Sequence, residues 1–341
     1  MISTGRFSDG KNECKMMKLD SNKALILMAF VISARASSFM FSKLCLVSMT
    51  SYSLLALRFS TAAVLLLLLF HRRLIPAMNW QNIRSGIIIG TVFYFVLAAE
   101  LAGLKTSTAS MSAFIENLAI VIVPFFECVL MRKYPEKKSI LSACLAVCGV
   151  GALTMLGNQL GFSVGECFLL AAAFLYAVGI IVTDRLAKSG DSFAIGFVQV
   201  ATTGILGWIN VIFTGNFTMP TSSSQWLMIL VLAVVCTGFG FTLQPVAQAH
   251  MSAETASSFC SLAPLIAALL SCIFLKDPVT IHSLIGAFLI LLSLAIQTNL
   301  VKLPTNRSGK FSRTIFANLS VKAPWKMHAD ATRDVQHKNV S

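Results

Sequence analysis

The chain has 341 residues, of which 56% are hydrophobic and only 12% are charged, about half the share that is usual in soluble proteins. This composition excludes a soluble globular domain and predicts a polytopic membrane protein in a lipid bilayer. The net charge of +13 would fit a nucleic-acid partner if it lay in a folded basic domain. The Lys and Arg residues fall instead in the two tails and in short loops, so we expect no nucleic-acid partner.

Apolar segments follow one another along the chain, each near the ~20 residues that cross ~30 Å of hydrocarbon as a helix. Helices are expected because backbone amides in lipid must be paired within the segment. The predicted spans are residues 24–44, 52–70, 85–104, 109–131, 139–157, 165–184, 193–213, 226–247, 253–275 and 279–299. The predicted fold is therefore an all-α polytopic membrane protein with ten transmembrane helices.

The orientation follows from the distribution of Lys and Arg. With residues 1–22 as a cytoplasmic N-terminal tail, nearly all basic residues outside the spans fall on the cytoplasmic side. An even number of spans also places residues 300–341 in the cytoplasm, where their polar, basic composition predicts a disordered tail. We therefore expect a multi-pass protein of the cell membrane with both termini in the cytoplasm.

The chain contains an internal duplication. Residues 105–144 align with residues 249–288 at a constant offset of 144, and residues 52–58 align with 193–199 at an offset of 141. The two repeats are predicted at 23–157 and 165–299, each with five helices. Because five is odd, the second repeat enters the membrane from the opposite side, and the repeats are inverted.

Ionisable residues inside apolar spans are costly, so they point to a wet cavity or to one another. Arg35 lies midway along the first span, either as a cavity cation for a substrate carboxylate or in an ion pair with Glu100 or Glu116. Glu116 is a candidate proton or substrate site, with a static pair to Arg35 as the alternative. For Arg58, snorkelling to the membrane surface is the leading alternative to a functional role.

Repeat-related positions add polar candidates. Glu100 aligns with Gln244, and Asn117 aligns with Ser261, which favours polar faces contributed by both repeats. Helix-to-helix hydrogen bonding is the alternative role for Glu100 and Gln244. Three prolines are predicted to bend spans four, eight and nine and are candidate hinges: Pro124, Pro245 and Pro264.

Several functional classes lack support in the sequence. No Walker-type loop appears, and no histidine or aspartate is central in a span, so we expect neither ATP-driven pumping nor an enzyme. Cys144 and Cys148 share a helix face without a histidine or acid, so we expect no metal, and we expect no cofactor. The remaining classes are a secondary transporter of a small molecule and a non-transporting receptor or scaffold, as a monomer or a homodimer.

Short motifs in both repeats resemble the drug/metabolite transporter superfamily, EamA type. They include residues 37–39 (SSF), 56–59 (ALRF), 101–115 (LAGLKTSTASMSAFI), 252–256 (SAETA), 262–264 (LAP) and 275–278 (LKDP). The resemblance covers about residues 24–299. It implies ten helices in two inverted repeats, a central cavity, and export or exchange of small metabolites that are amino-acid-like or drug-like.

The chain departs from the family pattern at two places. Residues 132–133 (RK) stand where the family often has an acid after the fourth helix, and residues 35–36 (RA) replace a Trp-Gly pair in the first. The second departure puts an arginine where an aromatic side chain would line the cavity. The resemblance therefore does not transfer a particular substrate to this chain.

Overall fold

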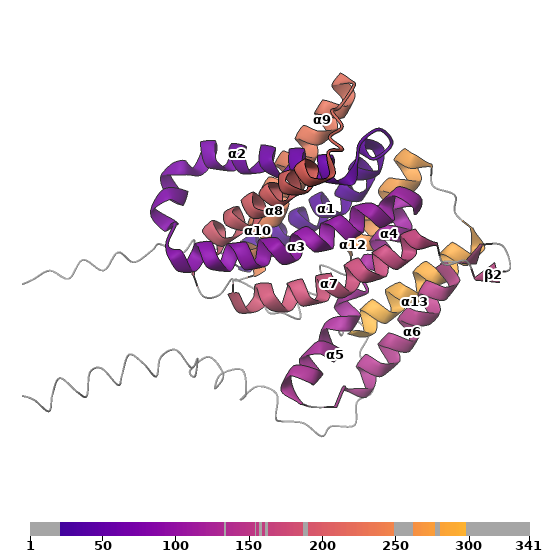
Figure 1. The fold of residues 1–341 in the computed structure, drawn as a ribbon. Helices are drawn as coiled ribbons and strands as arrows, with labels where there is room; N and C mark the ends of the chain where they lie inside the picture. The colour runs from indigo at the N-terminus through magenta and orange to yellow at the C-terminus, as the bar shows by residue number, and fades with distance from the viewer. Residues whose placement is uncertain are drawn as a thin grey trace, which may run out of the picture. The chain divides into compact units, whose positions relative to one another are not determined.

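The computed structural model describes residues 21–132, 134–153, 155–156, 159–160, 163–186, 190–248, 262–276 and 280–297 (Figure 1). The first half contains α1 (Ser21–Cys45), α2 (Ser51–Ala77), α3 (Trp80–Thr106), α4 (Ala109–Glu116), α5 (Ala119–Met131) and α6 (Lys137–Leu153). The second contains α7 (Val164–Leu186), α8 (Ser192–Thr214), α9 (Ser223–Val231), η2 (Leu232–Phe239), α10 (Gly240–Gln248), α12 (Ala263–Leu270), η3 (Ser271–Leu275) and α13 (Ile281–Gln297).

These helices fall in the predicted apolar segments. Within the described ranges, seven helical segments are long and apolar enough to span a membrane, and the shorter apolar helices are 263–275 and 281–296. The protein is therefore an all-α, multi-pass membrane protein, as its composition predicts. Several boundaries differ: α2 continues to Ala77 beyond the predicted end at 70, α3 begins at Trp80 before the predicted start at 85, and α6 ends at Leu153 before the predicted end at 157. After α6 the strand β1 (Met155–Leu156) pairs antiparallel with β2 (Gln159–Leu160).

The packing of the helices follows the duplication. In the first repeat, α3 packs against α7 and α8 of the second repeat. The equivalent of α3 in the second repeat is the span α9–η2–α10. It packs against α1 and α2, which are the equivalents of α7 and α8. Two spans pack against their own equivalents, α2 with α8 and α6 with α13, and the latter two lie side by side in Figure 1. Each contact thus recurs after exchange of the repeats, as two copies related by a pseudo-twofold axis require.

Small residues bring these helices close together. A Cβ atom on Gly90 of α3 would lie 2.8 Å from the carbonyl oxygen of Gln199 in α8, and one on Gly207 would lie 2.9 Å from the amide nitrogen of Ala56. Only glycine permits backbones to approach this closely. Between α6 and α13, the hydroxyl of Ser142 donates to the Ser293 carbonyl (2.8 Å), and the Ser293 hydroxyl donates to the Ser142 carbonyl (2.7 Å).

A polar cluster joins α1 to the ends of α3 and α7. The Lys43 ammonium donates to the carbonyl oxygens of Leu104 (2.7 Å), Lys105 (3.0 Å) and Ser107 (2.7 Å), which lie at the C-terminus of α3. A cation suits this position because the last carbonyls of a helix have no partner within the helix. The Ser107 hydroxyl donates to Glu166 at the start of α7 (3.1 Å). We call Lys43, Ser107 and Glu166 the α1–α3–α7 clasp.

The fourth and ninth spans share two main-chain features. In the described parts of these spans, the helices α5 and α12 begin after the equivalent residues Leu118 and Leu262. The same spans end at the equivalent residues Arg132 (φ 52°) and Lys276 (φ 54°), both in the left-handed conformation. The described non-glycine residues include no other positive φ. The duplication therefore extends to backbone conformation.

The three prolines that were predicted to bend spans do not all lie at interruptions of the helices. Pro124 lies inside α5, whereas the fourth span is broken earlier, at Asn117 and Leu118. The Asn117 side chain donates to the Ala113 carbonyl (2.8 Å), so it competes with the helical hydrogen-bond pattern. Pro264 lies in the first turn of α12, where its missing N–H is tolerated. Pro245 lies within α10.

Candidate functional site

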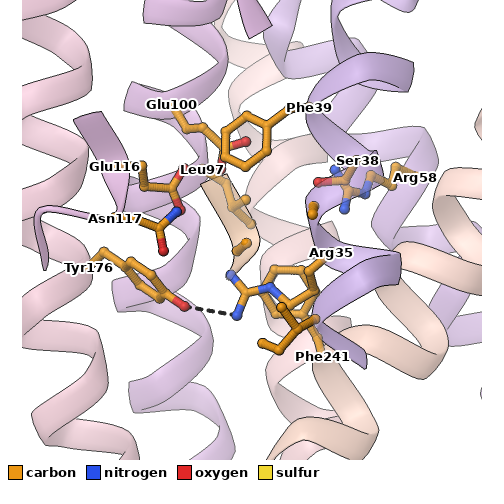
Figure 2. A pocket seen from close by; sticks show the side chains of 13 residues that line it. Arg35, Ser38, Phe39, Arg58, Leu97, Glu100, Glu116, Asn117, Tyr176 and Phe241 are labelled. Atoms are coloured by element: carbon orange, nitrogen blue, oxygen red, sulfur yellow. Dashed lines mark hydrogen bonds between the residues drawn. The ribbon is translucent and has the colours of Figure 1, made fainter. Parts of the chain in front are cut away.

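A small cavity of about 30 Å³ lies among helices of both repeats, with room for only one or two water molecules (Figure 2). Polar and charged side chains come mainly from the first repeat, and aromatic side chains come from both. The lining residues are Ile32, Arg35, Ala36, Ser38, Phe39, Arg58, Leu97, Glu100, Glu116, Asn117, Tyr176, Phe241 and Ala263.

Arg35 of α1 is held by hydrogen bonds and by aromatic rings. Its Nη1 donates to the Tyr176 hydroxyl at 2.9 Å and to Gln244 Oε1 at 2.5 Å. Its guanidinium carbon lies 4.7 Å from the ring centroid of Phe241 and 5.3 Å from that of Tyr176. Gly240 leaves space for this side chain, since a Cβ there would lie 3.1 Å from Arg35 Cγ. The arginine is therefore fixed in place by the second repeat.

The contacts of Arg35 lie across the pseudo-twofold axis. Arg35 and Tyr176 are 141 positions apart, the offset that aligns the second helices of the two repeats. Gln244 is the repeat equivalent of Glu100, which lines the same cavity. Arg35 thus contacts its own equivalent and the equivalent of a cavity acid. A site built in this way joins the two repeats at one point.

Glu100 of α3 and Glu116 of α4 form a carboxyl pair. Their side chains are 3% and 4% exposed, and the two carboxyl groups interact electrostatically. Two neighbouring buried carboxyl groups favour the state in which one of them is protonated. Both groups feel the positive charges of Arg35 and Arg58. Glu116 Oε2 is buried and has no hydrogen-bond partner among the described residues. The pair can therefore hold a single proton and still accept a hydrogen bond.

The structure brings together most of the residues that the sequence singled out. Arg35, Glu100, Glu116 and Asn117 all line the cavity, and Gln244 contacts Arg35. Ser261 lies outside the described residues. The hydrogen bonds that position Nη1 of Arg35 run to neutral side chains. The two alternatives for Arg35, a cavity cation and an ion pair with an acid, both stay predictions.

Arg58 is a cavity residue for which snorkelling to the membrane surface was the leading alternative to a functional role. Its side chain is 1% exposed and points into the bundle. Its Nε donates to Thr237 Oγ1 at 2.5 Å and its Nη1 to Ser42 Oγ at 3.5 Å. Thr237 lies in the π-helical segment η2, and such segments are frequent at functional sites. A lipid-facing or snorkelling position is therefore wrong for Arg58.

Two aromatic cavity residues, Tyr176 and Phe241, were also missed. The rings of Phe93 and Phe241 meet edge to face at a centroid distance of 5.8 Å, and Phe93 meets Tyr176 at the same distance. For Tyr176 a signal existed, since the offset of 141 carries Arg35 onto it. Phe241 had no signal, because an aromatic residue in an apolar span is ordinary core composition. In the part of the chain described, no cluster of three His, Cys, Asp or Glu residues is placed to hold a metal.

Comparison with known proteins identifies the family. The model of the EamA-like transporter family matches residues 22–155 and again residues 163–298. The chain belongs to this family. It is 23% identical over 287 residues to an uncharacterized transporter of Archaeoglobus fulgidus. This alignment covers 84% of this chain and 88% of the archaeal protein. It is 25% identical over 276 residues to the uncharacterized transporter YetK of Bacillus subtilis, covering 77% of this chain and 83% of that one.

A protein of known crystal structure has the same fold. It superposes with a TM-score of 0.61 at 17% sequence identity and covers 82% of this chain and 97% of its own. Together with the membrane-length helices, the family match establishes a multi-pass membrane transporter.

Proposed function

We propose that this EamA-like protein is a secondary transporter that exports or exchanges a small metabolite by alternating access, with both termini in the cytoplasm. The observation that carries the proposal is the cavity between the two repeats, which is charged but too small for a metabolite. A substrate reaches Arg35 and the carboxyl pair only if the helices around the cavity separate. Movement of one repeat against the other opens such a site to each side in turn.

The α1–α3–α7 clasp supports this proposal because it ties helices of both repeats at one end of the bundle. Lys43 and Ser107 belong to the first repeat, and Glu166 belongs to the second. These contacts involve side chains at helix ends, so they can break without unfolding any helix. The predicted topology puts the clasp on the side opposite the cytoplasm. The proposed closed state is therefore sealed on that side and opens when the clasp separates.

The carboxyl pair makes a proton the natural coupling ion. In the proposed mechanism Glu100 and Glu116 together hold one proton, and the charged or titratable side chains that line the same cavity are Arg35, Arg58 and Tyr176. A substrate that alters the hydrogen bonding of this pair changes its hold on the proton. The cavity lies within one chain, so either a monomer or a homodimer suffices for this mechanism.

The proposal is tested by counterflow into proteoliposomes. The probes are a radiolabelled panel of the twenty protein amino acids, lactate, malate and the cationic dye ethidium. We expect at least one probe to be exchanged and to accumulate when a pH gradient is imposed. Glu116→Gln should abolish the pH-driven accumulation and leave the protein folded, because the amide cannot release a proton.

The matched control is Glu136→Gln, since Glu136 is 74% exposed and pairs only with Lys138 at 3.5 Å in the described part of the chain. This variant should behave as the unchanged protein. If no probe that binds is ever moved, the alternative of a non-transporting receptor or scaffold holds instead. Normal pH-driven accumulation in Glu116→Gln would contradict the proton role alone.

A further inference from the structure

We propose that Arg58 binds a carboxylate group of the transported molecule, so that the substrates are metabolites that carry a carboxylate. The inference rests on the proposed transport function, but it concerns a different side chain from the proton-holding pair. It assigns to Arg58 a role in substrate recognition that its position in the sequence does not suggest.

The first argument is the incomplete hydrogen bonding of the guanidinium. A guanidinium group has five N–H donors. In the described residues Arg58 uses them only toward two hydroxyls, those of Thr237 and Ser42, and its remaining contact is with the ring of Phe59 at 5.4 Å. The arginine nevertheless lines the cavity. Three donors are therefore left for a ligand that enters there.

The second argument is charge. No carboxylate of the described chain lies within ion-pair distance of Arg58, and its side chain is almost completely buried. A buried charge without a counter-ion costs several kcal/mol, and a substrate anion removes that cost. The titratable groups that act on it electrostatically are the Cys236 thiol, Glu100, Arg35 and the Cys45 thiol. The Arg58 end of the cavity thus carries a positive charge without an ion-paired carboxylate among the described residues.

The third argument selects a carboxylate over a phosphate. A guanidinium pairs with either group through parallel hydrogen bonds. A phosphate ester carries −1.5 to −2 charges at neutral pH, and it would face the negative charge of the Glu100–Glu116 pair across a small cavity. A carboxylate carries one negative charge and needs only the one cation that Arg58 provides. The single guanidinium is thus matched to a monoanionic group.

The carboxyl pair indicates which chemical group the substrate carries at the end opposite its carboxylate. Glu116 Oε2 is a buried acceptor without a partner in the described residues. A substrate hydroxyl or ammonium group would donate a hydrogen bond to it, which removes the cost of the unpaired acceptor. Hydroxy- and amino-carboxylates therefore match the two ends of the cavity. Figure 2 shows Arg58 and Glu116 extending from different helices around the same space.

The test measures binding by the full-length protein in lipid nanodiscs. The probes are lactate and serine, their amides lactamide and serinamide, in which an uncharged carboxamide replaces the carboxylate, and glycerol 3-phosphate. In the unchanged protein we expect a carboxylate to bind about 100-fold more tightly than its amide, because a buried charge-assisted pair is lost in the amide. In Arg58→Gln this preference should disappear. A purely structural role would weaken the acid and the amide equally and leave their ratio unchanged.

A second variant guards against misfolding of Arg58→Gln. Thr237→Val removes the acceptor of Arg58 Nε but keeps the side-chain volume, so it should reduce the preference for the acid by several-fold in a folded protein. The proposal is overturned if no carboxylate probe binds, if amides bind as well as acids, if glycerol 3-phosphate is preferred, or if the preference survives in Arg58→Gln. If the carboxylate binds with the expected preference over its amide but counterflow is absent, the transport function is contradicted and the carboxylate site at Arg58 is supported.

Discussion

The two repeats share a backbone plan but contribute different chemistry to the cavity. The first repeat supplies Arg35 and Glu100, and the equivalent positions of the second hold Tyr176 and Gln244. The same contrast holds for Arg58 and its equivalent Gln199, which is also buried. In each pair the first repeat has an ionisable group that is charged or protonated, and the second has a neutral side chain that can hydrogen-bond.

This difference has a physical reason. If the two repeats were identical, each arginine and each acid of the cavity would meet a second copy of itself near the pseudo-twofold axis. Like charges in a low-dielectric interior repel strongly. With one member of each pair neutral, Tyr176 and Gln244 can hold Arg35 without adding charge. In the proposed mechanism, the duplication supplies the geometry of a two-sided transporter, and the asymmetry of side chains gives the cavity one acid pair and one substrate site.

The largest effect is expected when a neutral cavity side chain of the second repeat is replaced by a charged one. Gln244→Glu would place a carboxylate where Oε1 now accepts from Arg35 at 2.5 Å. The resulting buried ion pair should hold α1 against α10 and oppose the separation of the repeats. We expect counterflow to fall about 100-fold or more, while the protein stays folded as judged by size-exclusion chromatography and thermal melting. Gln81→Glu, at an exposed position early in α3, is the matched control.

A double variant sharpens this result. In Glu100→Gln combined with Gln244→Glu, the number of acids is unchanged and only the repeat that carries the acid differs. If the charge alone mattered, the double variant would transport normally. We expect it to remain inactive, because the acid would face Arg35 and no longer act on Glu116 from position 100. Recovery of counterflow would show that the two halves are interchangeable.

A smaller effect is expected when a neutral partner is weakened. Tyr176→Phe removes the 2.9 Å hydrogen bond to Arg35 but keeps the ring, whose centroid lies 5.3 Å from the guanidinium. One such hydrogen bond contributes about 1 kcal/mol, so we expect an about fivefold loss of substrate affinity in counterflow. Tyr134→Phe, at a residue that is 98% exposed, should change nothing. An unchanged affinity in Tyr176→Phe would mean that the aromatic contacts alone position Arg35.

The fold was predictable because it is encoded in patterns that the bilayer imposes. Lipid requires long apolar helices, and the positions of these segments along the chain are readable from hydrophobicity. The duplication was readable as well, because Leu118 and Leu262 lie at the same offset as Arg132 and Lys276. The early end of α6 at Leu153 was missed, since apolarity continues past the point where a hairpin begins.

The site was predictable only where charge identifies it. Arg35, Glu100 and Glu116 were singled out because an ionisable residue in a span needs an explanation. Arg58 was misplaced because distance from a helix start does not tell which face of the helix points inward. Tyr176 and Phe241 acquire their role by contact with Arg35, and that contact depends on packing between helices far apart in sequence.

The smallest effect tests the part of the comparison in which the repeats are alike. Arg132 and Lys276 both end a span with positive φ, a conformation that costs a non-glycine residue about 1–2 kcal/mol. Arg132→Gly and Lys276→Gly should each remove this cost, less the greater entropy of glycine in the unfolded chain. We expect each to raise the free energy of unfolding by about 1 kcal/mol, measured by denaturant titration in detergent, and counterflow to be unchanged. Equal gains would show that the equivalence is a property of the backbone. A gain at one position and a loss at the other would show that one of these basic side chains has contacts of its own, and that the asymmetry of the cavity extends to the ends of the helices.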